Sequence, residues 1–253
     1  MQTKHIKAVI SGGASGLGLA TAKRFVEAGG SVTLLDVNEQ AGQAACETLG
    51  ANRAFFIAND VTDEAQVDAA MDQAHGHMGG LNVLVNCAGI LGSGRVLGRE
   101  GPLPLAHFNQ TIQINLCGSF NTSKAAASRM QHNEGEEKGV IIHTASVAAY
   151  EGQIGQAAYS ASKGGIVGMT LPMARELARF GIRVMTIAPG VFHTPMVDGM
   201  TPEIQEALAA GIPFPKRLGQ PDEFGALACH IVESEYFNGS VIRLDGAVRL
   251  EPK

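Results

Sequence analysis

Residues 11–18 read Ser11-Gly12-Gly13-Ala14-Ser15-Gly16-Leu17-Gly18, and they stand between a short apolar run and a segment with helical spacing. Glycines at such a junction allow a tight turn, a close approach of the backbone to a pyrophosphate, and packing of the next helix against a sheet. The N-terminus of that helix also attracts an anion. The stretch therefore predicts a dinucleotide site that includes Gly12, Ser15, Gly16, Leu17 and Gly18.

The rest of the chain alternates short β-branched runs with longer helical segments, which is typical of βαβ units on a parallel sheet. With 253 residues the chain fits one large domain better than two. We predict a single α/β domain over residues 1–253, with a Rossmann-type doubly wound seven-stranded parallel sheet and helices on both faces. The predicted strands are Ile6–Ser11, Ser31–Asp36, Arg53–Ile57, Asn82–Asn86, Gly139–Thr144, Arg183–Ala188 and Ser240–Leu244. The predicted helices are Leu17–Ala28, Glu39–Leu49, Glu64–Gly76, Leu105–Gln131, Ala157–Phe180 and Pro221–Ile231.

Two stretches fit neither pattern. Residues 91–104 are rich in glycine and arginine, and residues 192–218 are interrupted by four prolines. Both follow the carboxyl ends of predicted strands, where open α/β sheets bind ligands. Long loops in such places commonly cover a ligand, so we expect two substrate loops there.

Composition and residue spacing exclude several classes of function. The formal charge is −5 and the basic residues are scattered, so no positive stripe favours nucleic acid. No window of about 18 apolar residues and no signal segment appears, which predicts a soluble, cytoplasmic protein without a membrane partner. The eight histidines form no ligand motif, which predicts no metal. Four cysteines without CxxC spacing are predicted to be reduced thiols in the core, namely Cys46, Cys87, Cys117 and Cys229.

Asp36 closes the second predicted strand, where a carboxylate can accept hydrogen bonds from an adenosine ribose. A carboxylate about 4 Å from a 2′-phosphate would meet roughly 4 kcal/mol of repulsion per charge at an effective dielectric near 20. No lysine or arginine stands between Gly13 and Gly18, or between Asp36 and Gln40, to offset this repulsion. The cofactor is therefore predicted to be NAD and not NADP. The alternative interpretation of Asp36 is a solvated carboxylate at a strand end.

Further cofactor contacts are predicted where the third and fourth strands end. The run Asn59-Asp60-Val61-Thr62 ends the third strand, where a polar side chain and the backbone can meet adenine edges. The small residues Ala88 and Gly89 after the fourth strand allow the backbone to pass close to a cofactor. Asn86 is a candidate contact, and it could instead tie neighbouring strand ends together. For Asp60 and Asn86, turn capping is an equally good interpretation.

Tyr159 and Lys163 are four residues apart on a predicted helix, so both side chains lie on one face. A nearby ammonium lowers the pKa of a phenol from its ordinary value of about 10. A cation roughly 4 Å away supplies enough interaction energy to lower that pKa by about three units. Ser146 ends the fifth strand at the same sheet edge, where its hydroxyl can hydrogen-bond a reacting oxygen. Taken alone, Tyr159 and Lys163 could be a pair on the protein surface, and Ser146 could be a capping residue at the strand end. Combined with a dinucleotide loop, they predict catalysis.

These motifs, together with Asn115 and Pro189-Gly190, resemble the short-chain dehydrogenase/reductase family, in the right order and over essentially the whole chain. The resemblance implies that Tyr159 is the general acid/base, that Lys163 lowers its pKa and holds the nicotinamide ribose, and that Ser146 orients the substrate. It also implies that Asn115 holds a water in a proton relay. Contacts to the nicotinamide are implied for Pro189, Gly190 and Thr194. The sequence departs from the family at Cys87, where a second asparagine is more common.

Longer runs resemble one subgroup, the type II 3-hydroxyacyl-CoA dehydrogenases (17β-hydroxysteroid dehydrogenase type 10-like). The resemblance implies NAD-dependent oxidation of 3-hydroxyacyl-CoA to 3-ketoacyl-CoA in fatty acid metabolism, an acyl-CoA thioester as substrate, and a homotetramer. A 3-oxoacyl-carrier-protein reductase and a hydroxysteroid or other alcohol dehydrogenase remain alternatives, although Asp36 argues against an NADPH-linked reductase. A non-catalytic NAD-binding scaffold would normally lack Ser146, Tyr159 or Lys163. The runs that carry the resemblance are 144–170, 181–190, 212–219 and 241–247.

Overall fold

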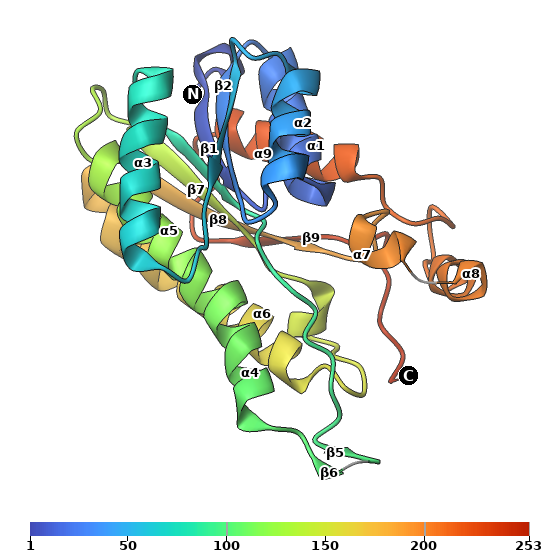
Figure 1. Cartoon of the computed structure of the whole chain (residues 1–253). Coiled ribbons are helices and arrows are strands. Elements are labelled where there is room, and N and C mark those ends of the chain that lie inside the picture. The colour runs from blue at the N-terminus through green and yellow to red at the C-terminus, as the bar shows by residue number, and fades with distance from the viewer. Residues whose placement is uncertain (100, 200, 253) are drawn as a thin grey trace.

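The computed structural model describes residues 1–99, 101–199 and 201–252. Its central feature is a seven-stranded parallel sheet with the order β3-β2-β1-β4-β7-β8-β9 (Figure 1). The strands are β1 Lys7–Ser11, β2 Ser31–Asp36, β3 Ala54–Ala58, β4 Val83–Asn86, β7 Gly139–Thr144, β8 Ile182–Pro189 and β9 Val241–Leu244. The helices are α1 Gly16–Glu27, α2 Glu39–Leu49, α3 Glu64–Met78, α4 Leu105–Ile112, α5 Gly118–Met130, α6 Ala157–Leu177, α7 Pro195–Asp198, α8 Pro202–Ala210 and α9 Pro221–Glu233. The predicted doubly wound fold is confirmed.

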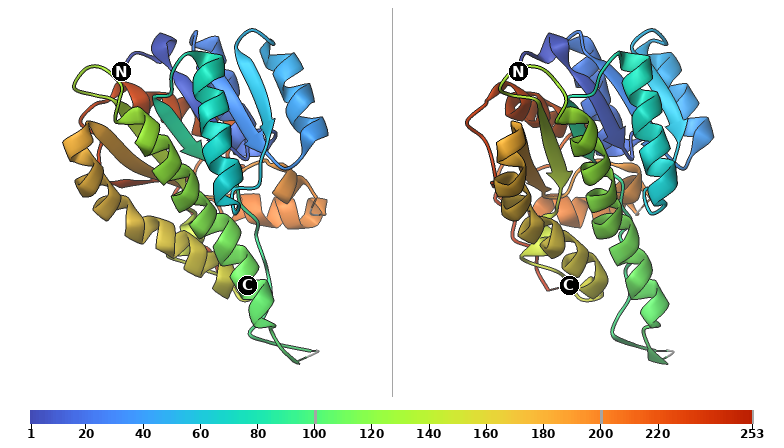
Figure 2. Two further views of the ribbon diagram at one scale, coloured as in Figure 1. Left: turned by 60° about the vertical axis from the view of Figure 1, so that its left-hand side comes forward. Right: turned by 90° about the vertical axis from the view of Figure 1, so that its left-hand side faces the viewer.

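Helices cover both faces of the sheet (Figure 2). Successive side chains of a strand point to opposite faces, so Ala8 and Ile10 of β1 pack with α1, α2 and α9, whereas Val9 packs with α3, α5 and α6. Phe25 and Phe224 fill the first layer and Met71 and Met130 the second, and all four are fully buried. Burial on both faces explains why the strands are continuous apolar runs without alternation.

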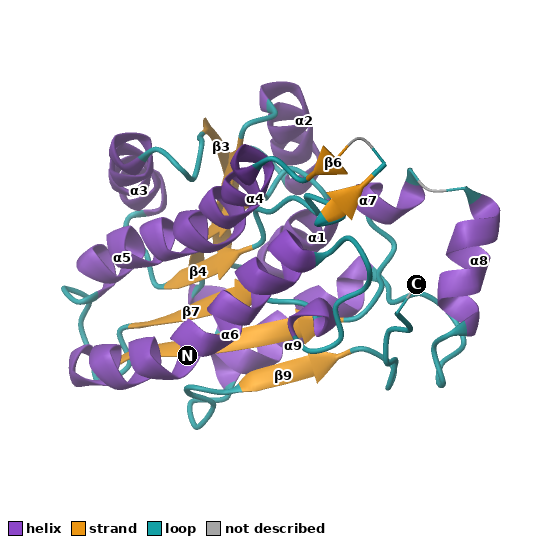
Figure 3. Ribbon diagram, turned by 90° about the horizontal axis from the view of Figure 1, so that it is seen from below, coloured by secondary structure: helices purple, strands orange, loops and turns teal. Residues whose placement is uncertain are grey.

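The carboxyl ends of the strands form the functional edge of the sheet. In Figure 3 the arrows of β4, β7 and β9 point the same way, toward α7, α8 and the C-terminal end. The chain winds from β1 outward through β2 to β3, then returns to place β4 on the other side of β1. Such a reversal of strand order opens a crevice beyond β1 and β4. The glycine loop follows β1 directly and lies in this position.

The stretch 192–218 contains two helices that the sequence did not predict, α7 and α8. Its four prolines predict breaks in regular structure, but Pro195 and Pro202 each occupy the first position of a helix. Proline suits that position because its fixed φ is helical and its missing N–H would have no partner there. The stretch 91–104 also carries a short hairpin of β5 Leu97–Gly98 and β6 Gly101–Pro102, which projects from the body beside α4 (Figure 1).

The single helix predicted over Leu105–Gln131 is divided in the structure. A π-helical turn, Gln113–Cys117, separates α4 from α5. The cysteines are free, and Cys46, Cys87 and Cys229 pack against the core as predicted, whereas the predicted place of Cys117 in the core is wrong. Cys117 lies in the π-helical turn and is exposed, and the other three are half-buried. No helix within the described ranges is long and apolar enough to cross a membrane.

Asn86, at the end of β4, connects the strands of the functional edge. Its Oδ1 accepts hydrogen bonds from Thr122 at 2.7 Å and Ser11 at 3.3 Å, and its Nδ2 donates to Ser123 at 3.0 Å. The Nδ1 atom of His143 lies 3.2 Å from the same Nδ2. His143 is fully buried on β7, and burial with the charge of Lys163 lowers its pKa from 6.5 to about 3. A neutral imidazole therefore accepts from Asn86.

The buried imidazole predicts a specific pH dependence of stability. Between pH 6.5 and about 3 the unfolded chain binds a proton at His143 that the folded chain does not, so stability is full above pH 6.5 and falls as the pH drops. From pH 7.5 to 5.5 this costs about 1.4 kcal/mol, which His143→Asn abolishes while keeping an acceptor for Asn86. Urea unfolding of both proteins at the two pH values measures the difference. Equal losses in both proteins would contradict a neutral His143 in the fold.

Candidate active site

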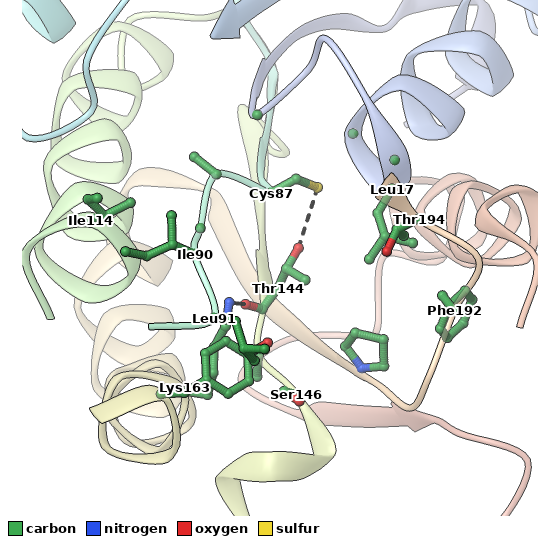
Figure 4. Close-up of a pocket in the computed structure, with 18 of the residues that line it drawn as sticks. Leu17, Cys87, Ile90, Leu91, Ile114, Thr144, Ser146, Lys163, Phe192 and Thr194 are labelled. Carbon is green, nitrogen blue, oxygen red and sulfur yellow. Dashed lines mark hydrogen bonds between the residues drawn. The ribbon is translucent and has the colours of Figure 1, made fainter. Parts of the chain in front are cut away.

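A cavity of about 550 Å³ lies at the carboxyl edge of the sheet. Figure 4 shows side chains from the glycine loop, the ends of β4, β7 and β8, and α6 converging on it. Most of the residues predicted to form the site line this cavity. They are Gly12, Ser15, Gly16, Leu17, Gly18, Asp36, Asp60, Val61, Ala88, Gly89, Ser146, Tyr159, Lys163, Pro189, Gly190 and Thr194.

The glycine loop is shaped by close backbone contacts. A Cβ on Gly12 would lie 2.7 Å from the Ala88 nitrogen, and one on Gly18 would overlap the Gly12 carbonyl oxygen. Gly12 and Gly16 also have left-handed φ values of +65° and +52°. Ser15 is the N-cap of α1, and its side chain makes no capping hydrogen bond in the described structure. The first residues of α1 line the cavity and their N–H groups receive no capping bond from Ser15, as an anion site at a helix N-terminus requires.

Asp36 spans the glycine loop and the turn after β2. Its Oδ2 accepts from the Ala14 N–H at 3.2 Å, and its Oδ1 accepts from the Asn38 N–H at 3.1 Å. The carboxylate is therefore held in a fixed position on the cavity wall, which differs from a freely solvated strand end. Asp60 caps its own turn by accepting from the N–H and hydroxyl of Thr62. Asp60 therefore caps its turn and also lines the cavity.

Asn59, the first residue of the run expected to meet adenine, also belongs to the cavity wall. Its side chain is 4 % exposed, and neither amide atom has a hydrogen-bond partner in the described structure. Buried amides are almost always paired, so an unpaired one in a residue that lines a cavity fits a polar ligand with both donor and acceptor groups. An adenine edge offers both. With the glycine loop and Asp36, this amide fits the adenosine part of a nicotinamide dinucleotide.

Ser146, Tyr159 and Lys163 come together at the end of β7 and the start of α6. The Ser146 hydroxyl accepts from the Ala148 N–H at 3.1 Å, and it lies close enough to the Tyr159 phenol to oppose the rise of its pKa. The Lys163 Nζ donates to the Thr144 carbonyl at 2.8 Å (Figure 4). The same Nζ lies 5.7 Å from the centre of the Tyr159 ring. Burial lowers the pKa of Lys163 from 10.5 to about 8.

The expected effect of Lys163 on Tyr159 is not what the structure shows. Tyr159 and Lys163 share a helix face as predicted, but the pKa of Tyr159 is raised above its ordinary 10 and not lowered. Burial is the largest cause, and the Ser146 hydrogen bond opposes it. The prediction counted the attraction of the phenolate to Lys163 and to a positive nicotinamide, and it left out the cost of burying the phenolate. Tyr159 is therefore a neutral phenol in this structure, which suits a proton donor.

Asn86 and Asn115 do not line the cavity. Asn86 makes the inter-strand contacts described above. Asn115, fully buried in the π-helical turn, accepts from the Ile90 N–H at 2.8 Å and donates to the Ile90 carbonyl at 2.9 Å and to Ser162 at 3.0 Å. Ser162 donates in turn to the Tyr159 carbonyl at 2.7 Å. Asn115 thus fixes the chain after β4 to the helix that carries Tyr159.

The structure adds cavity residues that the motifs did not indicate. Gln153 and Gln156 precede Tyr159, and their position between Ser146 and Tyr159 was the available signal. Leu208 lies on α8, which was expected to be irregular, and Leu250 follows the last strand. Within the described ranges no group of three or more His, Cys, Asp or Glu side chains is arranged to hold a metal ion.

Comparisons with known proteins agree with this architecture. The family model for short chain dehydrogenases matches residues 7–205. Human 3-hydroxyacyl-CoA dehydrogenase type-2 is 51% identical over 98% of this chain and 97% of its own, and the Drosophila melanogaster protein of that name is 45% identical over 98% and 99%. The crystal structure of 3-hydroxyacyl-CoA dehydrogenase type-2 from Mycobacterium avium is 42% identical, with a TM-score of 0.91 over 97% of this chain and 96% of its own. The chain belongs to the short-chain dehydrogenase family and is an oxidoreductase that uses a nicotinamide dinucleotide.

Proposed function

We propose that the protein is an NAD-dependent dehydrogenase that interconverts 3-hydroxyacyl-CoA and 3-ketoacyl-CoA thioesters. The observation that carries this proposal is one cavity that joins a glycine loop and Asp36 to Ser146, Tyr159 and Lys163. The printed names of the relatives support the substrate class. The apolar side chains in the same cavity support it as well, because an acyl chain needs such a wall. They include Ile90, Leu91, Val191, Val197 and Leu208.

The cofactor would be held along the edge from β2 to β8. The first N–H groups of α1 and the backbone of Gly12 and Gly16 would bind the diphosphate, and Asp36 would accept from the adenosine ribose. Pro189, Gly190 and Thr194 would contact the nicotinamide end. When bound, the nicotinamide supplies the site that accepts or releases hydride.

The charge distribution of the cavity supports NAD over NADP. Among the lining residues that the structure describes, Lys163 is the only basic side chain, and it lies with Tyr159 and not with Asp36. A 2′-phosphate beside Asp36 would therefore meet a carboxylate without a compensating cation. Hydrogen bonds from Ala14 and Asn38 hold that carboxylate in place, so it cannot easily turn away.

Proton transfer is assigned to Tyr159. In reduction, hydride reaches the carbonyl carbon while the Tyr159 phenol donates its proton to the carbonyl oxygen, which gives the alcohol. In oxidation, the phenolate would take the hydroxyl proton while the hydride of the breaking C–H bond is taken up by the nicotinamide and the carbonyl forms. Ser146 would hydrogen-bond the same oxygen as its charge changes. Lys163, charged below its pKa of about 8, would stabilise the phenolate form and hold the ribose.

The two predicted substrate loops keep that role in the proposal. Leu91, from the stretch 91–104, and Thr194 and Leu208, from the stretch 192–218, all line the cavity. The base of the hairpin is also tied to the loop before α6, because the Gly94 N–H donates to the Gly155 carbonyl at 2.8 Å. Both stretches are therefore in contact with the part of the site that would hold the substrate.

Tyr159→Phe removes the proton donor and leaves the ring in place. We expect kcat with a 3-hydroxyacyl-CoA and NAD to fall by about two to four orders of magnitude. Binding of NADH, followed by its fluorescence, should change little because the phenol is not needed for it. Tyr236→Phe is the matched control, since that fully exposed side chain lies outside the cavity. A Tyr159→Phe enzyme with most of its activity would rule out this mechanism.

Asp36→Asn removes the charge that opposes a 2′-phosphate and keeps a side chain of the same shape. The ratio of kcat/KM for NAD to that for NADP should fall by about tenfold or more. Glu39→Gln, which changes the charge equally at the exposed start of α2, should leave the ratio unchanged. An unchanged ratio in Asp36→Asn would show that this carboxylate does not select the cofactor.

Ser146→Ala should shift the pH profile of oxidation. The reaction needs the Tyr159 phenolate, so kcat/KM rises as the pH approaches the pKa of Tyr159 from below. Ser146 lowers that pKa by its hydrogen bond, so its loss moves the midpoint of the remaining activity to higher pH. Stopped assays over a pH series give both midpoints. A midpoint that stays in place or moves to lower pH would contradict the assigned contact.

A further inference from the structure

The C-terminal tail, residues 248–252, packs against the α7–α8 segment. Val248 is 3 % exposed and forms an apolar cluster with Val197, Ile212 and Leu218. Leu250 and Leu208 are partly buried against the same cluster. Figures 1 and 3 both place the C-terminal end between α6 and the α7–α8 segment. The tail is therefore part of the packed structure at the functional edge.

Hydrogen bonds attach the tail to the loop that leads into α6. The Ile154 N–H donates to the Pro252 carbonyl at 3.0 Å, and the Gln153 side-chain amide donates to the Glu251 carbonyl at 3.0 Å. Gln153 itself lines the cavity. These two contacts use backbone carbonyls of the tail, so they hold its path without depending on its side chains.

An ion-pair cluster fixes the start of the tail. Arg243, on β9, pairs with Glu151 at 2.7 Å and Asp245 at 2.7 Å, and it also donates to the Val248 carbonyl at 3.2 Å. Arg249 lies 3.3 Å from both Glu151 and Asp245. The same cluster thus joins β9, the loop before α6 and the tail, so the position of the tail is coupled to the position of the loop before α6.

Leu250 is the tail residue that reaches the cavity, where Leu208 of α8 also lines the wall. We propose that the tail forms one wall of the acyl-binding part of the cavity and that Leu250 determines which acyl chain lengths the enzyme accepts. This inference rests on the proposed function, because it takes the substrate to carry an acyl chain. A short chain leaves the leucine in place, whereas a long chain must pass it or displace it.

The test changes the size of this side chain in both directions. Leu250→Ala should raise the ratio of kcat/KM for 3-hydroxyhexadecanoyl-CoA to that for 3-hydroxybutyryl-CoA by about tenfold, and Leu250→Phe should lower it by a similar factor. Glu251→Ala is the matched control, because that exposed side chain is a neighbour in the tail and its carbonyl bond to Gln153 is kept. Its ratio should equal that of the unaltered enzyme.

The controls separate folding, the substrate class and the role of the tail. Melting temperature and NADH affinity of each variant show whether it is folded, and a poorly folded Leu250→Ala is replaced by Leu250→Val. The panel also contains a short and a long secondary alkanol. An enzyme that oxidises the alkanols but none of the 3-hydroxyacyl-CoA thioesters would overturn the proposed function. The ratio of kcat/KM for the long alkanol to that for the short one would then test whether Leu250 selects chain length. Variants that keep the unaltered chain-length ratio in every series would overturn the role of Leu250.

Discussion

The hydrogen bonds of the buried Asn86 side chain hold together the elements that form the site. Asn86 connects β1 through Ser11, β7 through His143, and α5 through Thr122 and Ser123. Leaving such a buried amide unpaired would cost about 1 to 3 kcal/mol. These hydrogen bonds therefore fix the positions of the ends of β1, β4 and β7 relative to one another. The glycine loop follows β1, Ala88 follows β4 and Ser146 follows β7. Their convergence on one cavity therefore depends on these contacts.

Burial controls the chemistry of the catalytic side chains more than the attraction between them. It lowers the pKa of Lys163 and raises that of Tyr159, so each group is shifted toward its neutral form. An ammonium and a phenolate together are easier to keep in this cavity than either one alone, because each compensates the other. Ser146 and the Thr144 carbonyl supply the hydrogen bonds that keep the two side chains in reach of one another.

The sequence was sufficient to predict the sheet, because buried parallel strands are apolar on both faces and are bounded by polar ends. Each of the seven strands was placed within one residue. Prediction from the sequence failed where one residue type is compatible with two local structures. Pro195 and Pro202 can end or begin a helix, and only tertiary packing chooses between these outcomes. The contacts of Asn115 and Leu250 depend on partners distant in the chain, such as Ile90 and Leu208, and no local pattern reveals them.

The π-helical turn between α4 and α5 restricts how this region can change in length. It directs Asn115 at Ile90 and Ser162, and a residue inserted or deleted anywhere between Leu105 and Asn115 would rotate that amide by about 100° around the helix axis. The β5–β6 hairpin, whose Val96 and Leu97 are exposed, has no such requirement. Natural length variation among relatives is therefore expected to accumulate at the hairpin tip and to spare the helix that follows it.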